Sequence, residues 1–107
     1  QGIYAADDTM VAGAIDAARA QGLDVEGLII TSIGNTFLGN PLVGEGVLDG
    51  TVFQSSSWDG ANAVRGIYAA MTGETSLGRD DGSSVLYMPN PKVTIDNWEA
   101  PDVAPEW

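Results

Sequence analysis

The first fourteen residues place an apolar strand directly against the start of a helix. The run from Ile3 to Ala6 suits a buried strand, and it ends in two carboxylates, Asp7 and Asp8. A helical pattern begins at Thr9 with no loop between. Junctions of this kind are typical of open parallel α/β sheets, in which ligands bind at the carboxyl ends of the strands. Because a helix N-terminus stabilises negative charge, both acids are predicted to stay ionised and to accept hydrogen bonds from a polyhydroxylated ligand.

Composition excludes several classes of function. The chain has 107 residues, enough for one small domain, and its 15 acidic and four basic residues give a net charge of -11. This acidic excess argues against binding to nucleic acid, which needs a basic face, and against attraction to anionic lipid. Cysteine and histidine are both missing, which excludes thiol catalysis, Ser–His triads and Cys/His metal sites. No cofactor is expected, and no apolar run approaches the roughly 20 residues that cross a membrane.

Strand-like and helical segments alternate along the chain. This order predicts βαβ units and therefore an α/β fold with a parallel sheet and flanking helices. Three short parallel strands make a thin sheet for two layers of helix, so we expect the chain to be a fragment of a larger fold. The predicted strands are 2–6, 27–33 and 50–54, and the predicted helices are 9–21, a short one after Gly34 limited by Pro41, and 58–72. A loop over 74–84, brief β runs at 85–88 and 93–95 and an irregular tail follow.

The helix predicted over 9–21 carries signals at both ends. Asp8 or Thr9 is predicted to be its N-cap, because either side chain can accept from the unpaired amides of the first turn. Gly22 stands where a helix C-terminus favours a residue of positive φ. Its apolar face is predicted at Met10, Ala14, Ala17 and Ala18.

The helix predicted over 58–72 is similarly delimited. Three serines, Ser55 to Ser57, are candidates for its N-cap, and Gly73 ends it. Its apolar positions are Val64, Ile67, Tyr68 and Met71.

Several segments, in order, resemble one protein family. They comprise the acidic pair and helix start at 7–14, Gly22, the strand 28–34, the segment 46–54, and the shorter motifs at 60–64, 72–74 and 93–97. Together they closely resemble the C-terminal part of ribose-type simple-sugar-binding proteins, which are the periplasmic-binding-fold substrate receptors of ABC importers. The resemblance spans nearly the whole chain. It implies a two-lobed periplasmic-binding fold, with a sugar in the cleft between the lobes.

The resemblance also implies three ligand-binding residues. Asp7 stands at the position of a direct sugar ligand, and Gln54 resembles the pocket glutamine at a hinge crossing. The family's pocket aspartate follows the middle strand, where this chain reads Ser32-Ile33-Gly34-Asn35, so Asn35 is the predicted contact there. The residues alone point the same way, because all three junctions lie at carboxyl ends of neighbouring strands, ~4.8 Å apart.

Domain organisation and partners follow from the same resemblance. Residues 1–54 would belong to the C-terminal lobe, and residues 55–84 would pack on the N-terminal lobe. Residues 85–107 would form the hinge return and a C-terminal tail. The expected partners are a sugar or polyol, the remaining N-terminal portion of the same protein and an ABC transporter permease. The expected location is periplasmic or extracellular, with a lipoprotein anchor in a Gram-positive cell.

Each predicted site residue also has a purely structural interpretation. Asp7 could be a solvated acid, Asn35 a helix cap and Gln54 a hydrogen-bonding partner in the hinge, while Asp8 is favoured as a cap over a ligand. Trp58 is favoured as a packing residue rather than a sugar-stacking one. The acidic turn at 80–83 resembles a calcium loop only faintly, because it lacks the later ligands of such a site.

Three classes of function were compared on these features. The favoured one is the non-enzymatic sugar-binding component of an ABC importer. The alternative is the effector-binding domain of a lactose-repressor-like transcription regulator, although the entry strand and turn typical of that group are missing here. An enzyme using the adjacent acids Asp7 and Asp8 is disfavoured, because no nucleophile or basic partner accompanies them.

Overall fold

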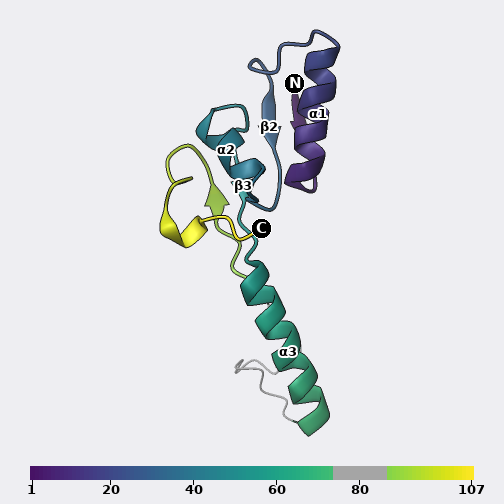
Figure 1. Ribbon diagram of the computed structural model, residues 1–107, viewed down its shortest axis with the longest axis vertical. Coiled ribbons are helices and arrows are strands. Elements are labelled where there is room, and N and C mark those ends of the chain that lie inside the picture. The colour runs from purple at the N-terminus through teal and green to yellow at the C-terminus, as the bar shows by residue number, and fades with distance from the viewer. Residues whose placement is uncertain (74–86) are drawn as a thin grey trace. The chain divides into compact units, whose positions relative to one another are not determined.

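The computed structural model describes residues 1–73 and 87–107. The chain divides into two compact units, residues 1–54 with 90–107 and residues 55–89. The described elements, shown in Figure 1, are β1 (Gly2–Tyr4), α1 (Asp8–Ala20), β2 (Ile29–Thr31), α2 (Gly39–Gly44), β3 (Thr51–Val52), α3 (Ser56–Thr72), β4 (Lys92–Val93) and the 3-10 helix η1 (Pro101–Val103). None of the described helices is long and apolar enough to span a membrane.

The first unit is built on a small, mainly parallel sheet. Strands β1 and β2 pair in parallel, with Ile3 opposite Ile30. Parallel bridges from Thr31 to Gly50 and from Gly34 to Phe53 continue the arrangement to β3. Strand β4 then pairs antiparallel with β3. The α/β class with a parallel sheet and flanking helices is confirmed, and the brief β run predicted near residue 93 adds an antiparallel edge.

Helix α1 packs its buried residues against β2. Val11, Ile15 and Ala18 follow the i, i+4, i+7 spacing of one helix face, and they share a core with Ile30. The predicted apolar face was right at Ala18, which is buried, and wrong at Met10, which is 64% exposed, and at Ala17, which is also exposed. The larger β-branched side chains fill the core instead, and they bury more apolar surface than the alanines of the predicted face. Gly22 has a φ of 72°, which confirms the predicted helix end.

Helix α2 begins later than the sequence pattern predicted. Its first residue is Gly39, and Pro41 lies inside its first turn instead of ending it. Proline is tolerated there because the first amides of a helix have no partner within the helix. Val43 of α2 packs in the same hydrophobic core as α1.

The C-terminal segment is packed against the core of the first unit. Val103, in η1, is 1% exposed and forms a second core cluster with Phe53 and Val93. Trp98 packs against both core clusters. Asn97 closes the preceding turn, because its side chain accepts from the Thr94 backbone N–H at 2.8 Å. The sequence predicted an irregular tail, and apart from η1 the segment has no regular helix or strand. Its packing could not be predicted, because these contacts join residues far apart in the sequence.

The second unit contains α3, which begins two residues before the predicted 58 and ends at the predicted residue 72. The Ser55 hydroxyl accepts from the Trp58 backbone N–H at 3.1 Å, and Gly73 ends the helix with a φ of 76°. Tyr87 and Met88 are not in a strand. The rest of that predicted β run, the predicted loop over 74–84 and the acidic turn at 80–83 lie outside the described residues.

Candidate functional site

The polar junctions at the carboxyl ends of β1, β2 and β3 form the candidate site. Asp7 caps α1, because its carboxylate accepts from the Thr9 backbone N–H at 2.7 Å. Hydrogen bonds from the Thr9 side chain and backbone lower the pKa of Asp7. A carboxylate that stays ionised can also accept charge-assisted hydrogen bonds from ligand hydroxyls. The prediction that Asp8 or Thr9 is the cap was wrong.

Asp8 is fully buried and joins three segments of the chain. Its carboxylate accepts from the Ser32 hydroxyl, from the Thr36 backbone N–H at 2.7 Å and from the Thr51 hydroxyl at 3.1 Å. These donors come from the end of β2, from the first residue of β3 and from the loop before α2. A buried carboxylate is stable only when such donors satisfy it. Asp8 therefore fixes the strand ends relative to one another.

Two glycines, Gly39 and Gly34, allow the backbone to approach the Asp8 carboxylate closely. A Cβ atom on Gly39 would lie 2.1 Å from the Asp8 Oδ2 atom, closer than real contacts allow. Gly34, on the other side, has a φ of 132° and a Cβ position 3.2 Å from the same oxygen. The backbone can surround the carboxylate because both positions lack a side chain.

Asn35 lies inside the protein and is fully buried. Its amide nitrogen donates to the Val103 backbone carbonyl at 2.5 Å, and its amide oxygen accepts from the Asn40 side chain at 3.2 Å. Its φ of 52° lies in the left-handed region, which asparagine tolerates better than most residues. Contact with a ligand, as predicted, would require these bonds to break.

Gln54 is held at the end of β3 through its backbone. Its N–H donates to the Gly34 carbonyl at 3.1 Å, and its carbonyl accepts from the Trp107 indole N–H at 3.1 Å. The half-buried side-chain amide has no hydrogen-bond partner among residues 1–73 and 87–107. An amide that both donates and accepts suits the mixed demands of a sugar hydroxyl.

The structure therefore separates the predicted site residues into two groups. Asp7 and Gln54 keep side-chain capacity for a ligand, whereas Asn35 is committed to internal hydrogen bonds. Thr36 and Thr51, which were not predicted as site residues, are partners of Asp8. Each of these threonines borders an apolar segment of the sequence. Threonines in such positions are too common to be recognised as partners of a buried acid.

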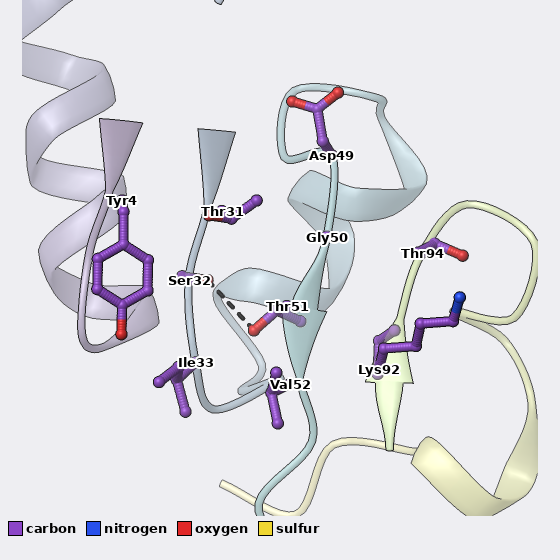
Figure 2. A pocket seen from close by; sticks show the side chains of 11 residues that line it. Tyr4, Thr31, Ser32, Ile33, Asp49, Gly50, Thr51, Val52, Lys92 and Thr94 are labelled. Atoms are coloured by element: carbon purple, nitrogen blue, oxygen red, sulfur yellow. Dashed lines mark hydrogen bonds between the residues drawn. The ribbon is translucent and has the colours of Figure 1, made fainter. Parts of the chain in front are cut away.

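Within the described part of the first unit, the side of the sheet opposite Ile3 and Ile30 carries exposed side chains, among them Tyr4 and Ile29. We call this surface the open sheet face and define it by Tyr4, Ile29, Thr31, Val52 and Lys92. A hollow of about 400 Å³ lies on it, with Gly50 among its lining residues (Figure 2). A second hollow of about 290 Å³ shares Tyr4 and Thr31 and extends to Ile29. Because Gly50 has no side chain, the open sheet face is hollowed at this position.

No cluster of three or more acidic residues that could hold a metal ion occurs within the described parts of the chain.

Trp58 is half-buried, and its backbone carbonyl accepts from the Asn62 side chain at 2.8 Å. This hydrogen bond ties the Asn62 side chain to the first turn of α3.

Comparison with known proteins assigns no family. No protein-family model matches the chain, and a search of curated proteins finds no match. Any function must therefore be argued from the site itself.

Proposed function

We propose that the chain is the C-terminal portion of a ribose-type solute-binding protein that delivers a sugar or polyol to an ABC importer. The observation that supports this most is the Asp8 network, which holds the ends of β1, β2 and β3 together. Asp7 then follows β1 with an ionised carboxylate, and Gln54 follows β3 with a side-chain amide that has no hydrogen-bond partner in the described part of the chain. Ligands of open α/β sheets bind at this edge.

In this proposal each side chain has a separate task. The Asp7 carboxylate accepts from ligand hydroxyls, and the Gln54 amide donates to one hydroxyl and accepts from another. Asp8 holds the strand ends and does not contact the ligand. The N-terminal portion of the same protein would supply the other wall of the cleft, and closure of the two lobes would exclude water from the ligand. The proposed location is periplasmic or extracellular, and the chain itself carries out no catalysis.

The experiment is a calorimetric titration of the native protein that contains this chain, with a panel of pentoses, hexoses, deoxysugars and polyols. Asp7→Ala and Gln54→Ala should each weaken binding of the best sugar by about tenfold or more, since hydrogen bonds of these types contribute about 1–3 kcal/mol. Asp16→Ala removes an exposed acid from α1 and is the matched control.

Two results would contradict the proposal. One is the absence of heat and of thermal stabilisation with every sugar in the panel. The other is a sugar affinity that Asp7→Ala and Gln54→Ala leave unchanged. A basic helix-turn-helix found by N-terminal sequencing of the native protein would instead favour the transcription-regulator alternative.

A further inference from the structure

Two hydrogen bonds hold Trp107 at the carboxyl edge of the sheet. Its indole N–H donates to the Gln54 backbone carbonyl at 3.1 Å, and its backbone carbonyl accepts from the Phe37 backbone N–H at 2.7 Å. These partners come from the end of β3 and from the loop before α2. The C-terminal segment therefore reaches the edge at which the proposed ligand binds, and Figure 1 marks the C-terminus near β3.

The indole of Trp107 stays accessible although it is fixed at both ends. Trp107 is 43% exposed, whereas Trp58 and Trp98 are half-buried. Holding a side chain in one position costs conformational entropy, which burial of apolar surface normally offsets. An indole that is fixed and still exposed leaves its large apolar surface in water. The ring of Trp107 is therefore preorganised for an apolar contact with a ligand.

Polar groups suited to hydroxyls lie at the same edge. Gln54, whose carbonyl holds the indole, has a side-chain amide without a hydrogen-bond partner in the ranges 1–73 and 87–107. Asp7 follows β1, and hydrogen bonds from Thr9 lower the pKa of its carboxyl, which keeps it an acceptor. An aromatic ring beside a few polar groups is the usual lining of a small-molecule site. A ligand that meets all of these groups carries hydroxyls and also an apolar face.

Backbone hydrogen bonds fix Trp107 relative to these polar groups. The Gln54 N–H donates to the Gly34 carbonyl at 3.1 Å, which ties the end of β3 to the segment after β2. The Thr36 N–H donates at 2.7 Å to the carboxylate of Asp8, the residue directly after Asp7. Ring, amide and carboxylate thus belong to one connected frame. A ligand does not have to order the ring when it binds, which lowers the entropic cost of binding.

We propose that Trp107 contacts the ligand directly and makes the site selective for a sugar in its ring form. This inference rests on the proposed sugar binding and names the class of sugar. A pyranose gathers several C–H groups on one face of its ring, and their weakly positive hydrogens pack against the negative face of an indole. An open-chain polyol has similar hydroxyls but no such apolar face. The Trp107 ring therefore favours the pyranose over the alditol of the same carbon number.

The test is a calorimetric titration of the native protein that contains this chain. The ligands are the pyranose of highest affinity and the alditol made by reducing it, and the wild type should bind the pyranose about tenfold more tightly or better. Trp107→Leu should weaken pyranose binding by about tenfold and leave alditol binding unchanged. Ile29→Ala is the matched control, because Ile29 is exposed and lies at the start of β2, away from the carboxyl edge. It should leave both affinities unchanged.

A second variant separates stacking by the ring from the anchoring hydrogen bond. Trp107→Phe keeps an aromatic face and lacks the indole N–H, so it should retain most of the preference for the pyranose. Tryptophan fluorescence gives a measurement that does not depend on Trp107→Leu keeping its fold. The pyranose should change the emission of the wild type and of Trp58→Phe, and this change should be missing in Trp107→Phe.

Three results overturn this inference and leave the proposed function standing. They are pyranose binding that Asp7→Ala weakens and Trp107→Leu does not, equal affinity for pyranose and alditol in the wild type, and a Trp107→Phe variant that binds the pyranose as weakly as Trp107→Leu. The last result would make Trp107 an anchor and not a ligand contact. The absence of binding to every sugar overturns the inference together with the proposed function.

Discussion

The carboxylate of Asp8 and the hydroxyl of Thr51 are 43 residues apart in sequence and 3.1 Å apart in the structure. This hydrogen bond joins the start of α1 to β3. The same carboxylate also binds the Ser32 hydroxyl. One buried acid thereby connects the three strand ends at which the proposed ligand binds, and its contribution to stability is separable from that of its neighbour Asp7.

Exchanging each acid for asparagine should give different losses of stability. Asp8→Asn puts an amide NH2 among three donors, so we expect the free energy of unfolding to fall by about 2–3 kcal/mol. Asp7→Asn keeps a good N-cap and should change it by less than about 0.5 kcal/mol. Urea denaturation followed by circular dichroism measures both. Equal losses in the two variants would show that Asp8 is not the connecting residue.

Asp7 should make stability depend on acid pH. Its pKa is lowered in the folded protein, so the unfolded chain binds a proton more readily than the folded one. The stabilisation is present above the ordinary carboxyl pKa of 3.8 and is lost as the pH falls through the lower, folded value. Urea denaturation at a series of acid pH values should therefore show a shallower loss in Asp7→Asn than in the wild type. Identical slopes in the two proteins would refute this assignment.

Two glycine-to-alanine substitutions should have opposite signs. Gly39→Ala would place a methyl group 2.1 Å from the Asp8 Oδ2 atom, and we expect it to cost about 2 kcal/mol or more by overpacking. Gly13→Ala adds a methyl group inside α1 with nothing within 4 Å, so it should stabilise by about 0.5–1 kcal/mol. Thermal denaturation compares them directly. A neutral Gly39→Ala would mean that the backbone around Asp8 can move aside.

Truncating the side chain of Val103 should destabilise the first unit. Val103 is 1% exposed and packs with Phe53 and Val93, so Val103→Ala should cost about 2 kcal/mol through the lost contacts and the cavity left behind. Val64→Ala, on an exposed residue of α3, is the control and should change stability by less than about 0.5 kcal/mol. Chemical denaturation at low protein concentration checks both. No effect of Val103→Ala would restore the view of this segment as an unpacked tail.

Local patterns predicted where α1 and α3 end. The limits of α3 follow from Ser55 and Gly73, whose preferences act within one turn of the chain. Gly22 ends α1 for the same reason. The parallel arrangement of β1 and β2 also follows from the order of elements, since a helix between two strands favours parallel pairing.

Contacts between residues far apart in the chain could not be predicted from one sequence. Asp7 and Asp8 are chemically identical neighbours, and the buried one is distinguished by distant partners, namely the Ser32 and Thr51 hydroxyls and the Thr36 backbone N–H. The same limit applies to Asn35. Its partner is the carbonyl of Val103, 68 residues away, and no periodicity in the sequence connects the two.

The bond from Asn35 to Val103 also bears on how the chain acquires its fold during synthesis. Helix α1 can form early, because its hydrogen bonds are local, but the Asn35 amide has to wait for the last tenth of the sequence. Contacts with such long separations slow folding and leave apolar surface exposed in the meantime. The nascent chain should therefore keep this apolar surface exposed until Val103 has left the ribosome.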